Sequence, residues 1–253
     1  MKRVVKIGGR AQGDPRLPAA LAAAAAAPGD TLCIVHGGGD EVSAMQRRLG
    51  LEPKFTGGRR VTSAEDLEVV RMVLSGTINK RLVAALLSRG VNAAGISGED
   101  AGLFTARATN ATMGRVGSEL TVKAALVQQL LAGGFVPVIS PLARDADDAA
   151  GSGLNVNGDD AAAALAAALL ADELVLVADV PGVLENGTVI PMIDRDHALA
   201  LIASGVAAGG MAAKLEAALL ALAAGTGRVR IAGLDGIGDP GAGTRITLSP
   251  QPV

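Results

Sequence analysis

Two glycine-rich turns stand out as places where backbone groups could hold an anion. One is KIGG at residues 6–9 and the other is HGGG at residues 36–39, and each ends a short β-branched run. Glycine lets N–H groups approach a ligand closely, and a helix that starts after such a turn adds partial positive charge. Neither turn has the Walker A or the G-x-G-x-x-G spacing. Each alone could be an ordinary tight turn, but the pair, with Lys6 ending the first run, suggests that both flank one anion.

The segment 155–160 offers more polar side chains than the start of a helix requires. It reads NVNGDD and directly precedes an alanine-rich helix expected over Ala161–Leu170. A single Asn or Asp is enough to cap a helix by accepting a backbone N–H. Two amides and two carboxylates leave a surplus, which favours a ligand site over capping alone.

Two basic residues follow glycine-rich loops elsewhere in the chain. Lys214 lies in the first turn of a helix expected over Ala212–Ala224, after the flexible GG at 209–210. Such a lysine, taken alone, is typical of a solvated surface. Arg60 belongs to the loop GGRRVT at 57–62, where its planar guanidinium could bind a carboxylate in bidentate fashion.

The elements that must position these residues alternate along the chain as short strands and longer helices. Apolar strands separated by amphipathic helices predict an α/β fold, a three-layer αβα sandwich around a mainly parallel central sheet. Ligands of such sheets bind beyond the carboxyl ends of the strands, where the glycine-rich turns lie. The segment Gly102–Glu119, richer in Thr, Gly and Arg, predicts an antiparallel hairpin. The expected strands are Arg3–Ile7, Thr31–Val35, Ala93–Ser97, Val136–Ile139, Leu174–Val177 and Val229–Ile231, and the expected helices are Glu41–Leu49, Ala64–Ser75, Thr77–Arg89, Val122–Ala132, Ala161–Leu170, Asp196–Ala203 and Ala212–Ala224.

Composition excludes several other classes of protein. The 253 residues carry a formal net charge of −2, which leaves no basic excess for a nucleic-acid backbone. The alanine-rich stretches are too weakly apolar for membrane spans, and the N-terminus leads straight into a strand rather than a signal peptide. The single cysteine, Cys33, excludes a disulfide framework and a cysteine-rich metal site and fits a reducing cytoplasm. The only two histidines, His36 and His197, lack the surroundings of a catalytic triad.

Taken together and in order, these motifs resemble the N-acetylglutamate kinase branch of the amino acid kinase family. The resemblance runs over nearly the whole chain, and chance does not explain so many segments in one order and spacing. Besides the segments above, it rests on VLSGTINK at 73–80, VPVIS at 136–140, DVPGV at 179–183, GMAAK at 210–214 and GTRI at 243–246.

The resemblance implies transfer of the γ-phosphoryl of ATP to the side-chain carboxylate of N-acetyl-L-glutamate, which is the second step of arginine biosynthesis. It also implies that Mg²⁺ is carried on the ATP phosphates and that the protein itself holds no metal. A carboxylate is already a nucleophile at neutral pH, so the site works by alignment and charge neutralisation. Lys6 and Lys214 would stabilise charge on the phosphoryl, and Asp159 would hold both lysines. The other implied contacts are Gly8, Gly9 and Gly38 for the phosphoryl, Gly38, Gly39, Arg60 and Asn155 for the acylamino acid, with Arg60 on its α-carboxylate, and Asp179, Val180, Pro181, Gly182, Val183, Leu184, Val206, Ala207 and Ala208 for the nucleotide.

Departures from the family pattern keep two alternatives open. Arg59 replaces an apolar residue and Gly158 replaces a common alanine, which bears on the acyl group. A related kinase acts on aminoadipate or glutamate attached to an acidic carrier protein, but a net charge of −2 gives little support for the cationic rim that such a carrier needs. An inactive amino-acid-binding regulatory protein would have lost a lysine or Asp159, and all three residues are present.

The resemblance also implies two lobes and a homodimer. Residues 1–171 would bind the acylamino acid and dimerise, and residues 172–253 would bind the nucleotide. Arginine-inhibited members of the family carry an extra N-terminal helix, whereas here only Met1 and Lys2 precede the expected first strand. We therefore expect an arginine-insensitive, cytoplasmic homodimer that acts on small molecules and has no nucleic-acid or membrane partner.

Overall fold

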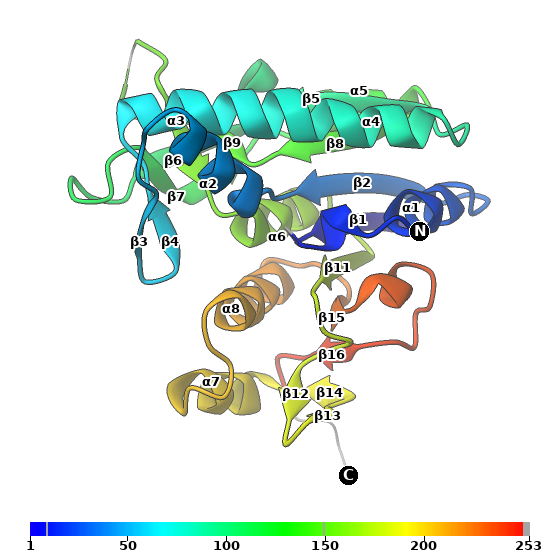
Figure 1. The fold of residues 1–253 in the computed structure, drawn as a ribbon. Helices are drawn as coiled ribbons and strands as arrows, with labels where there is room; N and C mark the ends of the chain where they lie inside the picture. The colour runs from blue at the N-terminus through cyan, green and yellow to red at the C-terminus, as the bar shows by residue number, and fades with distance from the viewer. Residues whose placement is uncertain (9, 149, 250–253) are drawn as a thin grey trace.

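The structure, a computed structural model, describes residues 1–8, 10–148 and 150–249. Within them, a main sheet runs through the middle of the molecule (Figure 1). Its neighbours are all parallel except for one antiparallel pair, β15 with β16. In order across the sheet, the strands are β14 (Met192–Ile193), β16 (Thr244–Ile246), β15 (Val229–Ala232), β11 (Glu173–Val177), β1 (Lys2–Ile7), β2 (Thr31–His36), β8 (Val136–Ser140) and β5 (Ala93–Ser97).

Helices cover both faces of this sheet, because successive side chains of its strands enter two different cores. Val5 of β1 packs with Leu21 and Leu86 on one face, and Val4 packs with Leu165 on the other. The expected three-layer αβα architecture is therefore confirmed. The helices are α1 (Leu17–Ala25), α2 (Gly39–Arg48), α3 (Ala64–Arg71), α4 (Asn79–Leu87), α5 (Ala125–Ala132), α6 (Gly158–Ala168), α7 (Arg195–Ala203) and α8 (Gly210–Ala223), with 3₁₀ turns η1 (Arg10–Gly13), η3 (Asp100–Gly102) and η4 (Leu234–Ile237).

The expected hairpin after β5 exists, but it is half of a small closed barrel. Strands β6 (Phe104–Ala108) and β7 (Val116–Val122) pair antiparallel, and β9 (Leu142–Asp145) and β10 (Gly153–Val156) close the barrel. Because Val122 pairs with Phe104 as a strand residue, the helix expected to start at Val122 starts instead at Ala125.

The two helices expected on either side of Gly76 form one continuous run, seen along the top of Figure 1. Ser63 and Asp66 form a capping box that starts α3. Between α3 and α4 the chain takes π-helical geometry in η2 (Met72–Ile78), so Gly76 loosens the helix without ending it. π-Helical turns are frequent at functional sites, and this one packs against the glycine-rich turn described below.

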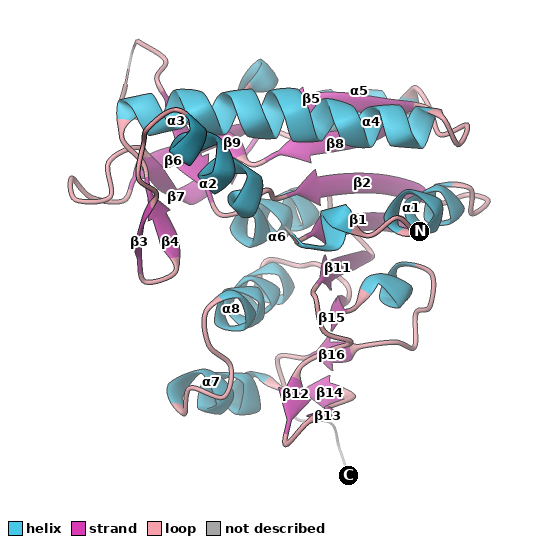
Figure 2. Ribbon diagram, viewed as in Figure 1, coloured by secondary structure: helices cyan, strands magenta, loops and turns pink. Residues whose placement is uncertain are grey.

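Short strands dominate the remaining segments, which Figure 2 shows as small arrows between loops. Strands β3 (Lys54–Thr56) and β4 (Arg59–Val61) form one hairpin, and β12 (Leu184–Glu185) and β13 (Thr188–Val189) form another. In the described part of the chain, no helix combines the length and apolar character that crossing a bilayer requires.

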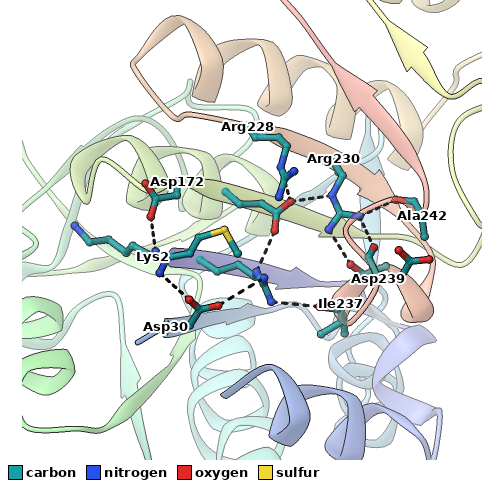
Figure 3. A network of polar contacts seen from close by, with 12 residues as sticks. Lys2, Asp30, Asp172, Arg228, Arg230, Ile237, Asp239 and Ala242 are labelled. Atoms are coloured by element: carbon teal, nitrogen blue, oxygen red, sulfur yellow. Dashed lines mark hydrogen bonds and ion pairs between the residues drawn. The ribbon is translucent and has the colours of Figure 1, made fainter. Parts of the chain in front are cut away.

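A buried ion network joins three central strands at their amino ends (Figure 3). Glu173, the first residue of β11, is fully buried, and its Oε1 lies 2.8 Å from Nε of Arg230 and 2.9 Å from Nε of Arg228. Its Oε2 lies 3.0 Å from Nε of Arg3 as an ion pair without hydrogen-bond geometry. Arg230 also donates to three backbone carbonyl groups, those of Gly236, Asp239 and Ala242.

Candidate active site

Two lysines from distant parts of the chain meet at one buried carboxylate. Lys6 lies near the carboxyl end of β1, Lys214 lies in the second turn of α8, and Asp159 lies in the first turn of α6. Nζ of Lys6 is 2.8 Å from Oδ1 of Asp159, and Nζ of Lys214 is 3.4 Å from Oδ2. The structure thus brings together the three residues expected to handle the phosphoryl group, and each oxygen of the carboxylate faces its own lysine.

In this triad of Lys6, Lys214 and Asp159, the charge of each group affects the pKa of its neighbours. Burial alone raises the pKa of the Asp159 carboxyl, but the two ammonium groups outweigh burial and leave the pKa below its ordinary value. Burial, together with the positive charge of Lys6, lowers the pKa of the Lys214 ammonium, and Asp159 only partly opposes this effect. An ionised carboxylate between two cations leaves a net positive charge, which suits the binding of a phosphoryl group.

Capping and ligand binding are divided among the residues of segment 155–160. Asn157 alone caps α6, because its Oδ1 accepts the backbone N–H groups of Asp159 and Asp160. The Asp159 side chain is therefore free to face the lysines, and Asn155 donates to Thr62 Oγ1 at 3.1 Å from the wall of a cavity. The surplus of polar residues in this segment does line the site.

The glycine-rich turns lie where β1 and β2 end, next to each other. The N–H of Gly37 donates to the carbonyl of Ile7 at 3.0 Å, which ties the second turn to the first strand. Gly38 has a φ of 149°, and a Cβ there would overlap the side chains of Leu74 and Ile78 in η2. A Cβ at Gly8 would lie 3.2 Å from the carbonyl oxygen of Val177, which is a tight contact. Gly9 lies outside the described residues.

A cavity of about 240 Å³ opens beside the triad. Arg60 lines it as a buried side chain, and its Nη2 donates to the carbonyl of Gly39 at 2.7 Å and to Ser43 Oγ at 2.8 Å, while its Nη1 donates to Gln46 Oε1. The Phe55 ring stacks on the guanidinium at 4.8 Å. Lys6, Gly38, Gly39, Asn155 and Asp159 line the same cavity.

The expected nucleotide-binding residues lie on two segments of the described chain, 179–184 and 206–208. Asp179, Val180 and Pro181 line a separate cavity of about 390 Å³ with Arg10 and residues 233–235. Val183 is buried and donates its N–H to Thr244 Oγ1, which fixes the start of the β12–β13 hairpin, with Gly182 and Leu184 on either side. Ala207 is buried, whereas Val206 and Ala208 are exposed on the loop before α8.

Several residues of the site were missed by sequence reasoning. Ser43 and Gln46 hold Arg60 from α2, where they share the buried stripe of the helix with Val42. Polar residues at buried helical positions are a signal that could have identified them. Arg59 pairs with Asp160 at 3.0 Å between Nη1 and Oδ2, and so connects the β3–β4 hairpin to the start of α6.

Comparison with known proteins identifies the family of this chain. The sequence matches the amino acid kinase family over residues 1–233. An acetylglutamate kinase of Chloroflexus aurantiacus is 45% identical over 247 residues, 96% of each chain, and one of Methanopyrus kandleri is 46% identical over 219 residues, 82% of this chain and 88% of that one. The solved structure of smu.665 from Streptococcus mutans UA159 matches with a TM-score of 0.85 at 30% identity, covering 98% of this chain and 99% of that one. The chain therefore belongs to the amino acid kinase family.

Proposed function

We propose that this enzyme is a kinase that transfers the γ-phosphoryl of ATP to the side-chain carboxylate of N-acetyl-L-glutamate, giving N-acetylglutamyl 5-phosphate and ADP in arginine biosynthesis. The observation that carries the proposal is the pair of lysines on Asp159 beside a cavity that also contains Arg60. The extensive similarity to proteins named acetylglutamate kinase supports the same reaction.

In the proposed mechanism, Arg60 binds the α-carboxylate and orients the substrate so that its side-chain carboxylate points towards Lys6. Nucleophilic attack on the γ-phosphorus forms the new P–O bond as the bond to the β-phosphate oxygen breaks, and ADP leaves with the electron pair. Lys6 and Lys214 stabilise the negative charge spread over the transferring group, and Asp159 keeps both ammonium groups in place. The N–H groups of Gly8 and Gly38 add donors that need no rearrangement.

The Mg²⁺ of this reaction belongs to the substrate, Mg·ATP. In residues 1–8, 10–148 and 150–249, no group of three or more His, Cys, Asp or Glu side chains lies close enough together to hold a metal ion. In the proposed complex the ATP phosphates hold the metal. Residues 179–184 and 206–208 remain the proposed nucleotide contacts, supported by the cavity that Asp179, Val180 and Pro181 line together with Arg10.

Two lobes, residues 1–171 and 172–253, and a cytoplasmic homodimer complete the proposal. The sequence has a single cysteine, Cys33, so no disulfide can form within the chain, and this supports a reducing location. Light scattering of the purified protein tests the dimer, and a monomeric mass would reject it.

The test of the function is hydroxylamine trapping of the acyl phosphate. Wild-type protein with Mg·ATP and N-acetyl-L-glutamate should form a hydroxamate, and Lys214→Ala should form almost none. Parallel reactions contain N-acetyl-aminoadipate and glutamate on an acidic carrier protein. Turnover of the carrier-linked substrate alone would establish the related carrier-dependent kinase, and no turnover of any substrate would support a regulatory protein.

A further inference from the structure

We propose that His36 is a positioning residue for the glycine-rich turn 37–39, held as the neutral Nδ1–H tautomer by Asn79. His36 ends β2 and is fully buried, as is Asn79 at the start of α4. Nδ1 of His36 is 2.9 Å from the carbonyl oxygen of Gly37, and Nε2 is 3.2 Å from Nδ2 of Asn79. Both ring nitrogens therefore have a partner, although the proposed reaction does not use the imidazole.

The contacts of Asn79 decide which way its amide points. Its Nδ2 donates to the carbonyl of Val138 at 2.8 Å, and its Oδ1 accepts from Nζ of Lys80 at 2.9 Å. A flipped amide would place Oδ1 against the Val138 carbonyl and the NH₂ group against the ammonium. Both contacts would then be repulsive, so the NH₂ group faces His36.

That orientation fixes the proton of the imidazole. Because Asn79 offers an N–H to Nε2, this nitrogen must supply a lone pair, and the ring proton must lie on Nδ1. Nδ1–H then donates to the Gly37 carbonyl. This carbonyl precedes Gly38, the N-cap residue of α2, which has a φ of 149°. Gly95 makes the arrangement possible, since a side chain there would overlap Oδ1 of Asn79.

The surroundings of His36 keep it neutral. Burial lowers the pKa of the imidazole to about 4, and the positive charges of Arg81 and Lys80 from α4 act in the same direction. The Gly37 carbonyl and Glu41 of α2 oppose them without reversing the shift. A neutral ring can accept from Asn79 and donate to Gly37, whereas a protonated ring would meet the Asn79 N–H with a second N–H.

The consequence concerns the substrate, and this part rests on the proposed function. Gly38 and Gly39 line the cavity with Lys6 and Arg60, and the Gly39 carbonyl is one of the groups that orient Arg60. A turn fixed by His36 presents its N–H groups to the acylamino acid without reorganisation. Loss of the Nδ1–H donor should therefore weaken acylamino-acid binding and leave the binding of Mg·ATP unchanged.

The first experiment needs no substrate, so it stands apart from the proposed function. With only His36 and His197 in the chain, ¹⁵N-labelled histidine gives two sets of ring signals in NMR spectra. Between pH 5 and 8, His36 should show a protonated Nδ1 and an unprotonated Nε2 without titrating, while the half-exposed His197 serves as the internal comparison. A proton on Nε2, or titration of His36 near the ordinary value of about 6.5, would overturn the proposal.

The second experiment compares two replacements that each keep one half of the imidazole. The amide nitrogen of His36→Asn can occupy the place of Nδ1 and donate to Gly37, whereas the longer His36→Gln reaches the place of Nε2 and loses that donation. We expect KM for N-acetylglutamate to rise about tenfold in His36→Gln, the scale of one lost buried hydrogen bond, and about threefold or less in His36→Asn. The KM for Mg·ATP should not change in either variant.

A purely structural histidine gives a different result. Under either role, each variant leaves one buried polar group unpaired, so both variants should show a similar fall in Tm. Only the KM values distinguish the two roles. Equal KM values for His36→Asn and His36→Gln, or a matched rise in both substrates' KM values, would refute positioning. If neither variant folds, the tautomer read from wild-type protein still decides the proposal.

Discussion

Glu173→Gln tests the buried ion network at the amino ends of β1, β11 and β15. The replacement keeps the shape of the side chain but removes the charge that three arginines face. Removing one partner of a buried ion pair destabilises a protein by about 3–5 kcal/mol, because the other charge stays buried. Arg230, with only 4% of its side chain exposed, is that remaining charge, whereas Arg228 at 32% can turn towards water. Arg230 keeps its hydrogen bonds to three backbone carbonyl groups, which partly stabilise its charge. We therefore expect the free energy of unfolding to fall by about 3 kcal/mol, the lower end of that range.

The assay is urea unfolding followed by far-UV circular dichroism, with thermal melts in parallel. For a chain of this size, a loss of about 3 kcal/mol lowers Tm by roughly 6–12 °C. The matched control is Asp147→Asn, which breaks the pair with Arg107, where both side chains are 60% exposed. Such a surface pair contributes about 1 kcal/mol or less. Because the network lies away from the carboxyl ends of the strands, kcat of Glu173→Gln at 25 °C should match that of wild type.

A small effect would refute this reasoning. If Glu173→Gln and Asp147→Asn unfold at the same urea concentration, the Glu173 charge is not what balances Arg230. If stability is unchanged but kcat falls, the network acts on the site rather than on the fold.

Other predictions concern the site itself. Lys214→Ala should lower kcat about a hundredfold or more, the scale of roughly 3 kcal/mol for one preorganised donor, and steady-state kinetics with unchanged kcat would contradict its role. Since burial lowers the pKa of Lys214, kcat of wild type should fall with rising pH before an ordinary lysine loses its proton, and Lys214→Arg should move that fall to higher pH. Arg60→Lys should raise KM for N-acetylglutamate but not for Mg·ATP, because an ammonium lacks the planar fork; equal rises would make Arg60 structural. For Arg59 and Asp160, a double-mutant cycle on KM for N-acetylglutamate should give a coupling of about 0.2–1 kcal/mol, and additive effects would show that this pair does not hold the hairpin over the cavity.

The sequence predicts six strands of the main sheet, because each is a short apolar run with a strong local signal. It misses the edge strands β14 and β16, which are only two and three residues long. It does not predict the barrel, since β10 pairs with β7 in parallel and β6 pairs with β9 only after the chain has returned from elsewhere. Gly76 marks a helix break by propensity, yet Val73 and Leu74 are buried and hold the π-helical segment together. In each case, contacts between distant segments decide the outcome.

In the candidate site, too, some residues have a local sequence signal and others are placed only by contacts between distant segments. Lys6, Asp159 and Arg60 lie in segments with recognisable local patterns, and the structure places all three at one cavity. The partnership of His36 with Asn79 joins residues 43 positions apart and has no local signal. The sequence around Glu173 does not predict its burial either, because a glutamate next to an apolar run usually faces solvent. Its burial depends on arginines from distant segments of the chain.

The central position of β1 has a consequence for synthesis on the ribosome. The strand pairs with β2 on one side and with β11 on the other, and about 140 residues separate His36 from Glu173. At translation rates of about 5–20 residues per second, the edge of β1 that pairs with β11 stays unpaired for roughly 7–28 s during synthesis. An unpaired edge is a template for aggregation, and cationic side chains oppose it. Lys2, Arg3 and Lys6 place three positive charges along β1, and such charges oppose pairing of an open strand edge with another chain.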